Sequence, residues 1–292
     1  MSTTALLLVL TAALLHASWN FVLKKSGGGL GILTLSAIIG SSILTPVGLF
    51  LMFAQKYAFT WAAFGMIAGS AVIHLAYFLL LDRAYRGTGG AGGNLSVVYP
   101  LARATGPLLT IVAATLFFGE RMTPIAMGGA VLILISAMVL TGDPRKIFSK
   151  ENGGAAGFAL LCGCTIAAYT VWDKQAVAWL LIPPVIFDWG AGLARCLMLT
   201  PLTMKREPGA IAKAWRTHRR TAIAIGVMSP LSYILVLTAM VNTPVSYVAP
   251  AREVSILFAA LLGAHVLNEG DAAKRTMAAL GMVLGISALA IG

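Results

Sequence analysis

Two arginines stand inside apolar runs of this sequence: Arg103 in "SVVYPLARATGPLLT" (96–110) and Arg252 in "SYVAPAREVS" (246–255). A guanidinium group is always charged and binds carboxylates through paired N–H donors. A charge at the centre of a bilayer costs about 2.5–3.5 kcal/mol on the milder insertion scale. We therefore expect both arginines to face a polar interior and to bind an anionic substrate group. Two alternatives stay open: pairing with a buried acid such as Glu253, and extension toward lipid headgroups.

Two groups of aromatic and polar residues share the spacing i, i+3, i+4, which places each group on one helix face. They are His16, Trp19 and Asn20, and Tyr169, Trp172 and Asp173. Such faces suit a zwitterionic or aromatic ligand, through stacking and hydrogen bonds. The alternative is a belt of aromatic side chains at headgroup depth, which Lys174 beside Asp173 favours for the second group.

His74 and Tyr77 lie three residues apart in the middle of an uncharged run. Histidine titrates near neutral pH, so a role in proton coupling is open beside simple packing. Tyr99 precedes Pro100, and a proline bends a helix; a cavity could close at that bend, although packing explains the tyrosine almost as well.

The predicted substrate-binding set combines these residues. It comprises His16, Trp19, Asn20, His74, Tyr77, Tyr99, Arg103, Tyr169, Trp172 and Arg252. Asp188 and Arg195 are seven residues apart, and we expect no direct bond between them. The three cysteines lie in apolar segments and are predicted to be buried and unreactive.

Composition indicates what must position these side chains. Of the 292 residues, 59% are hydrophobic and 11% charged, whereas soluble domains are about 25% charged. Uncharged runs such as 26–55, 57–81 and 221–251 exceed the roughly 20 helical residues that cross a bilayer. The sequence therefore predicts an all-α polytopic membrane protein. The first residues lack a basic start and a cleavage pattern, so they predict a membrane helix rather than a signal peptide.

Breaks at Gly, Pro and charged residues divide the chain into ten expected transmembrane helices. They are 3–24, 30–53, 61–82, 94–118, 123–141, 154–178, 183–204, 220–240, 244–267 and 275–291. Two sets of five resemble each other: "SVVYP" (96–100) matches "SYVAP" (246–250), and Arg103 and Arg252 each stand 17 residues before a glutamate, Glu120 or Glu269. Because five is odd, the second set must enter the membrane from the opposite side, as in many transporters. The predicted organisation is a five-helix repeat over 1–142, a cytoplasmic linker over 143–152 and an inverted repeat over 153–292.

The basic residues concentrate in the loops on one side of this ten-helix arrangement. Those loops carry Lys24, Lys25, Arg83, Arg86, Arg145, Lys146, Lys150, Lys205, Arg206, Lys213, Arg216, Arg219, Arg220, Lys274 and Arg275. The positive-inside rule makes that side cytoplasmic and places both termini outside the cell (inner) membrane. The net charge of +11 thus reflects topology, and we expect no nucleic-acid partner. The basic stretch 205–220 is expected to rest on anionic lipid.

The chain resembles the drug/metabolite transporter superfamily, in particular its EamA-like ten-helix family. The resemblance is carried by "HASWNFVLKK" (16–25), by "YP" (99–100) with "GER" (119–121), and by "AP" (249–250) with "NEG" (268–270). It implies movement of small metabolites, often amino acids or drug-like compounds, through a central cavity between the two halves. It also implies that the first, third and fourth helices of each half line the path. Family members are often drawn with cytoplasmic termini, which the charge distribution here opposes.

Together these patterns favour a secondary transporter, more readily an exporter, of small organic metabolites such as amino acids. The expected partners are the solute and membrane lipid; protons, the direction of transport and the oligomeric state stay open. No HExxH or paired-histidine motif is present, so we expect no catalytic residue, metal site or cofactor. The alternatives are an integral-membrane enzyme and a structural membrane subunit without a substrate.

Overall fold

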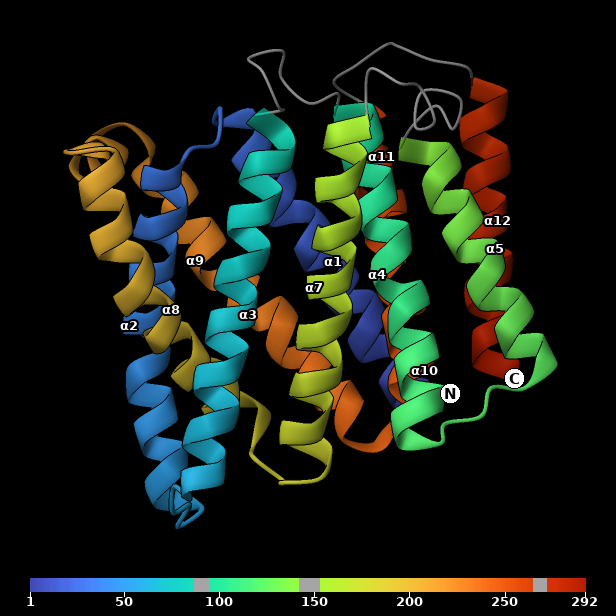
Figure 1. The fold of residues 1–292 in the computed structure, drawn as a ribbon, viewed down its shortest axis with the longest axis horizontal. Helices are drawn as coiled ribbons and strands as arrows, with labels where there is room; N and C mark the ends of the chain where they lie inside the picture. Colours follow the sequence, from blue (N-terminus) through green and yellow to red (C-terminus); the bar gives the residue numbers. More distant parts are fainter. Residues whose placement is uncertain (87–94, 142–152, 265–271) are drawn as a thin grey trace.

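The computed structural model describes the backbone of residues 1–86, 95–141, 153–264 and 272–292. All regular secondary structure in these ranges is helical (Figure 1). The elements are α1 Thr3–Lys25, α2 Leu30–Ala54, α3 Trp61–Arg86, α4 Leu95–Phe118, α5 Pro124–Thr141, α7 Gly153–Ala178, α8 Pro184–Arg206, α9 Ala210–Asn242, α10 Val245–Ala251, the 3₁₀ turn η2 Arg252–Val254, α11 Ser255–Ala264 and α12 Ala272–Ile291. The predicted linker 143–152 lies outside the described residues.

The helices are those of a membrane-embedded protein. Within the described residues, eight helical stretches are long and apolar enough to cross a bilayer, the last of them running from Val245 to Leu262 through η2. Two further apolar helices, Pro124–Leu140 and Thr276–Ile291, are shorter. Large apolar side chains cover the outside, with Phe53 and Leu116 each 73% exposed. Such a surface suits lipid chains, as the composition predicted.

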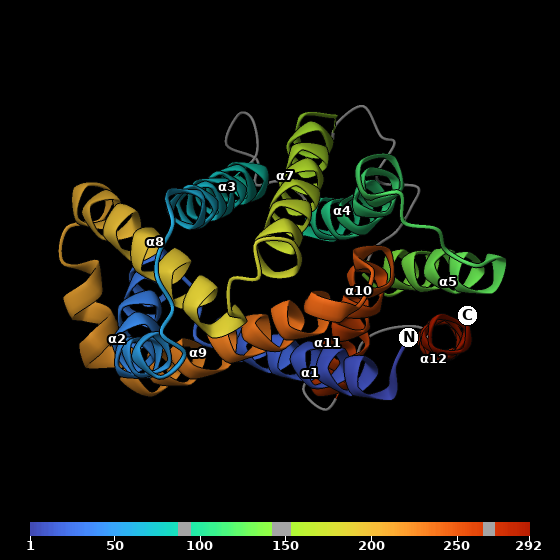
Figure 2. The ribbon, with the colours of Figure 1, turned by 90° about the horizontal axis from the view of Figure 1, so that it is seen from below.

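The helices form a bundle with a closely packed pair at one end. Figure 2 shows α5 against α12 at that end, and α2, α8 and the start of α9 at the other. Between the two ends, α7 packs between α3 and α4, while α1 packs against α9 and α11. The two ends of the chain meet, because the Met1 ammonium group donates to the carbonyl oxygen of Ala290 at 3.2 Å. Both termini therefore lie on the same face of the bundle (Figure 1).

Glycines set the closest approach of the helices. A Cβ atom at Gly129 on α5 would lie 2.6 Å from the carbonyl oxygen of Gly285 on α12, and one at Gly285 would lie 2.8 Å from that of Gly129. On α2, a Cβ at Gly40 would lie 2.7 Å from the carbonyl oxygen of Gly226 on α9. Small residues at such contacts allow helix backbones to pack directly in a membrane, where no hydrophobic force drives helices together.

The turn between α9 and α10 is held from both sides by charged side chains. The Glu120 carboxylate, just beyond α4, accepts hydrogen bonds from the backbone N–H groups of Val245 and Ser246, both at 2.9 Å. These N–H groups belong to the first turn of a helix, which leaves them without partners inside the helix. The Lys174 ammonium group donates to the carbonyl oxygens of Thr243, at 2.9 Å, and Met240 at the end of α9. The backbone carbonyl groups before the turn and the backbone N–H groups after it therefore have hydrogen-bond partners.

One predicted helix boundary was wrong, and one predicted helix contains a 3₁₀ turn. Helix α9 begins at Ala210 instead of near residue 220, and it bends at His218, where φ is −131° and ψ is 24°. The basic stretch before residue 220 therefore continues into a membrane helix through a kink. The predicted helix 244–267 is a single apolar span from Val245 to Leu262, within which the 3₁₀ turn η2 begins two residues after Pro250.

Candidate functional site

Aromatic rings from three helices converge inside the bundle. The His74 ring of α3 stacks on Tyr169 of α7, with ring centroids 4.1 Å apart and an angle of 24° between the planes. Tyr233 of α9 meets His74 edge-on at 5.5 Å, and Tyr77 meets Tyr169 edge-on at 6.1 Å. Three residues of the predicted set, His74, Tyr77 and Tyr169, are thus brought together. We call these three residues and Tyr233 the aromatic cluster.

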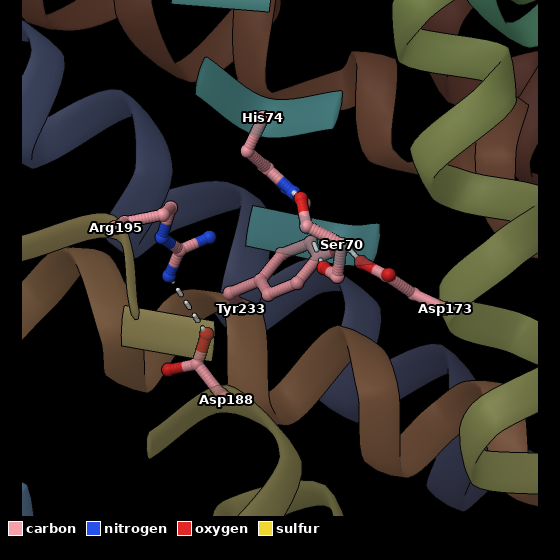
Figure 3. A network of polar contacts seen from close by, with 6 residues as sticks. All are labelled: Ser70, His74, Asp173, Asp188, Arg195 and Tyr233. Atoms are coloured by element: carbon pink, nitrogen blue, oxygen red, sulfur yellow. Dashed lines mark hydrogen bonds and ion pairs between the residues drawn. The ribbon is translucent and has the colours of Figure 1, made fainter. Parts of the chain in front are cut away.

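A carboxylic acid lies beside this cluster. Asp173 stands one turn after Tyr169 on α7 and has no exposed surface. The Tyr233 hydroxyl donates to Asp173 Oδ2 (Figure 3), and the Ser70 hydroxyl lies next to the same carboxyl group. Asp173 is therefore enclosed by hydroxyl groups from α3 and α9.

His74 has a defined tautomer in this arrangement. Its Nδ1 lies 2.9 Å from the carbonyl oxygen of Ser70 and 3.3 Å from the Ser70 hydroxyl. A carbonyl oxygen can only accept, so Nδ1 carries the proton, and in the neutral ring Nε2 is an acceptor. The Ser70 hydroxyl lies against His74 on one side and next to Asp173 on the other. Ser70, His74 and Asp173 thus form one polar path across the α3–α7 contact (Figure 3).

A second acid in this region is paired with an arginine, contrary to the sequence expectation. Arg195 Nη2 lies 3.3 Å from Asp188 Oδ1 on the same helix, α8. Seven residues rise about 10.5 Å along a helix, which seemed too far, but the long arginine side chain runs back along the helix to reach the acid. Asp188 is 2% exposed, so the pair is an internal one (Figure 3).

Arg252 faces the aromatic cluster from η2. Its guanidinium carbon lies 5.7 Å from the centroid of the Tyr233 ring, a cation–π contact. It also interacts electrostatically with His16 on α1, with His74 on α3 and with its chain neighbour Glu253. Among the described acids, none lies within ion-pair distance of Arg252. The guanidinium group therefore retains the capacity to bind a carboxylate.

Arg103 is held by the protein itself. Its Nε lies 2.9 Å from Glu253 Oε2, and its Nη2 donates to the Ser255 hydroxyl at 2.7 Å. Glu253 is 3% exposed. Of the alternatives left open for Arg103, internal pairing with Glu253 is the one present in this structure. The ion pair joins α4 to η2. Substrate binding by Arg103 stays a prediction.

The two tryptophans of the predicted set serve helix packing in this structure. Trp172 donates from Nε1 to the carbonyl oxygen of Met66 at 2.8 Å and fills the space that a side chain at Gly69 would occupy. Trp19 packs with apolar residues of α2 and α9 and meets His16 edge-on at 5.0 Å. Asn20 donates to the carbonyl oxygen of His16, one turn earlier on its own helix. The Tyr99 side chain lies outside the described part of the chain.

An apolar groove of about 380 Å³ lies between α4 and α7. Its walls include Leu116, Phe117 and Trp172, with Gln175 as a polar wall residue. Leu116 and Phe117 are each 73% exposed, so the groove opens on the face where lipid chains would lie. It is separate from the aromatic cluster. Cys164 also lines it and is exposed, so the prediction of buried cysteines holds for Cys162 and is wrong for Cys164.

The predicted substrate-binding set omitted several polar residues of this region, although Asp173, Asp188, Arg195 and Glu253 stood out in the sequence in other roles. The omitted residues are Ser70, Asp173, Asp188, Arg195, Tyr233 and Glu253. Asp173 carried a signal, because it occupies the position that matches Asn20 in the other half. Tyr233 carried none: it is an isolated tyrosine in an apolar helix. Among the described residues, no group of three or more His, Cys, Asp or Glu side chains is arranged to hold a metal ion.

Comparisons with known proteins support the fold. No protein-family model matches the chain, and no curated protein matches it. One solved structure, described only as "Crystal structure of protein", superimposes with a TM-score of 0.76 at 18% sequence identity. The similarity covers 100% of this chain and 98% of that chain. At this identity the likeness establishes a shared helical architecture over the whole length and nothing about function.

Proposed function

We propose that this protein is a secondary transporter, working as an exporter, of small organic metabolites such as amino acids. The observation that carries the proposal is the combination of Arg252 with the aromatic cluster inside an apolar bundle. Arg252 is half-buried, and a charge held inside an apolar bundle without a carboxylate partner is costly. A guanidinium group that has no acid of the described residues within ion-pair distance, beside stacked aromatic rings, supplies the groups needed to bind a small carboxylate.

The proposed binding mode assigns each group to a part of the solute. Arg252 binds the carboxylate through paired N–H donors. The stacked rings of His74 and Tyr169, with Tyr233, offer flat apolar surfaces and polar edges to the remainder of the molecule. His16 lies near both arginines and adds a polar group from α1. Selectivity among solutes would then depend mainly on the aromatic cluster.

The proposed mechanism is alternating access by two inverted five-helix halves within ten membrane spans. The sequence matches between the halves support it. The helix contacts also match between the halves. In the repeat α1 corresponds to α7 and α3 to α9, and α1 packs against α9 as α7 packs against α3. The reciprocal contact of Gly129 with Gly285 lies between the last helices of the two halves. In this proposal the basic loops face the cytoplasm, and both termini lie outside the cell membrane.

Transport by purified protein in liposomes tests the proposal. Wild-type protein is expected to move at least one member of a pooled L-amino-acid and metabolite panel in counterflow. Arg252→Met is expected to lower that flux at least tenfold, and Arg252→Lys to lower it less, because lysine keeps the charge without the paired donors. Arg219→Met, at an exposed position on α9, is the matched control and should transport normally. Absence of any solute movement by the wild type would refute the transporter proposal.

A further inference from the structure

Three acidic side chains are buried inside the described helices, and they differ in their partners. Glu253 has Arg103, and Asp188 has Arg195. Asp173 has the hydroxyl of Tyr233 and, beside it, that of Ser70. No lysine, arginine or histidine nitrogen of the described residues lies within ion-pair distance of it. Asp173 is thus the buried acid of this set without a cationic partner.

The cations nearest to Asp173 are engaged elsewhere. Lys174, the next residue on α7, points to the carbonyl oxygens at the end of α9. Arg195 on α8 is paired with Asp188. Arg252 of η2 lies over the Tyr233 ring, and His74 on α3 uses Nδ1 for the Ser70 carbonyl. The Arg195 charge acts on Asp173 from a distance, but none of these cations lies within ion-pair distance of the Asp173 carboxylate.

An ionised carboxylate without a counter-ion is expensive in such an interior, and the usual remedy is uptake of a proton. The surroundings accommodate that proton. Asp173 Oδ1 accepts no hydrogen bond of good geometry from the described residues, whereas Oδ2 accepts one from Tyr233. Oδ1 can thus carry the acid proton while Oδ2 accepts the hydrogen bond from the Tyr233 hydroxyl.

We propose that Asp173 is a proton-binding site at which a proton and the ammonium group of the solute alternate. This inference rests on the proposed function and adds its driving force. The protonated carboxyl group releases H⁺ to water when the ammonium group of an amino acid takes its place, and no other bond changes. The solute then lies with its ammonium group at Asp173 and its carboxylate at Arg252, on either side of Tyr233. Inward proton movement drives solute export.

The other half of the chain carries a neutral counterpart. Asn20 matches Asp173 in the sequence repeat, and its amide donates to a carbonyl oxygen of its own helix. An amide at this helix position is therefore compatible with a membrane helix of this fold. The substitution Asp173→Asn reproduces it and mimics the protonated acid in shape and charge.

Infrared difference spectroscopy of the purified protein tests the proton site without requiring transport. Between alkaline and neutral pH, wild-type protein is expected to gain a protonated-carboxyl C=O band that is absent in Asp173→Asn. The control Asp188→Asn should retain the band, because Asp188 is ion-paired. Tyr233→Phe keeps the acid and should shift the pH at which the band appears. A band unchanged in Asp173→Asn would overturn the proposal.

Transport measurements separate this inference from the proposed function. In liposomes, efflux of the L-amino-acid pool by wild-type protein should accelerate at least several-fold under an inwardly directed proton gradient. Asp173→Asn should transport more weakly, because it lacks the carboxylate that binds the ammonium group, and its residual transport should show no gradient dependence. Wild-type transport that ignores the gradient would overturn the proton site and leave the transporter proposal standing. If neither the wild type nor any variant moved a solute, the transporter proposal would be overturned. The infrared band would still test whether Asp173 binds a proton.

Discussion

The Arg103 guanidinium and the Glu253 carboxylate form a buried ion pair, with Nε 2.9 Å from Oε2. The pair connects α4 to η2, the point at which the α10–α11 helix is interrupted. Glu120, at the end of the same α4 segment, binds the first turn of α10. The α4 segment thus holds α10 at its first turn, through Glu120, and just beyond its last residue, through Arg103. These contacts predict that α4 and α10 move as one unit.

Removing one partner of the ion pair should destabilise the protein strongly. Arg103→Met leaves Glu253 buried without its counter-ion, which costs about 3–5 kcal/mol. The double variant Arg103→Met with Glu253→Gln should recover most of that loss, because no charge remains buried. Unfolding in detergent micelles measures both, with Arg219→Met as an exposed control. A single variant as stable as the wild type would contradict the structural role, and a stable double variant without transport would show that Arg103 also serves binding.

The Glu120 carboxylate should be needed for the start of α10. Glu120→Ala leaves the N–H groups of Val245 and Ser246 without their acceptor, and we expect a loss of about 1–3 kcal/mol. Hydrogen exchange at these two amides should accelerate more than exchange in α3. Glu207→Ala, at an exposed acid after α8, provides the comparison. Equal protection of both amides in Glu120→Ala would be incompatible with this cap.

Adjacent glycines on α5 should respond differently to the same substitution. A Cβ at Gly129 would meet the backbone of α12, whereas nothing lies within 4 Å of one at Gly128. Gly129→Ala should therefore destabilise the protein by about 1–3 kcal/mol through overpacking. Gly128→Ala should be neutral or slightly stabilising, because alanine favours the helix. Thermal unfolding of the two variants side by side tests the α5–α12 contact; similar melting temperatures would argue against it.

The distribution of charged loops predicts the orientation in the membrane. In a background in which Cys162, Cys164 and Cys196 are replaced by serine, Thr3→Cys should react with an impermeant maleimide in intact cells. Thr217→Cys, in the basic segment of α9, should react only after the membrane is permeabilised. Both positions are exposed, so burial does not explain a difference. Labelling of Thr217→Cys in intact cells would reverse the predicted orientation.

Residue patterns alone predicted much of the fold. Helix boundaries fell within a few residues wherever glycine, proline or charge ended an apolar run, as between α1 and α2. The prediction failed where a local signal had two meanings. The polar residues before 220 read as a loop, yet they form the kinked start of α9. The apolar run from 244 suggested an unbroken α-helix, yet it contains the 3₁₀ turn η2.

The site was harder to predict, because its members come from helices that are distant in the chain. The aromatic and polar residues on α3 and α7 could be selected by type and spacing, and His74, Tyr77 and Tyr169 do meet. Spacing could not reveal that Trp172 fills a notch at Gly69, or that Tyr233 would donate to Asp173. Those relations depend on how two helices are rotated against each other.

By itself, the sequence determined the environment and the class of structure: continuous apolar runs of roughly 20 residues or more cross a bilayer as helices, because a helix satisfies all backbone hydrogen bonds within the segment. It also singled out which residues are too polar to face lipid. Only the tertiary structure decided which acid pairs with which arginine. Among the described residues, it leaves Arg252 without an acid and Asp173 without a cation within ion-pair distance. The physical reason is that partner choice requires distances of a few ångströms between separate helices, and those distances arise from packing at glycines, kinks and caps.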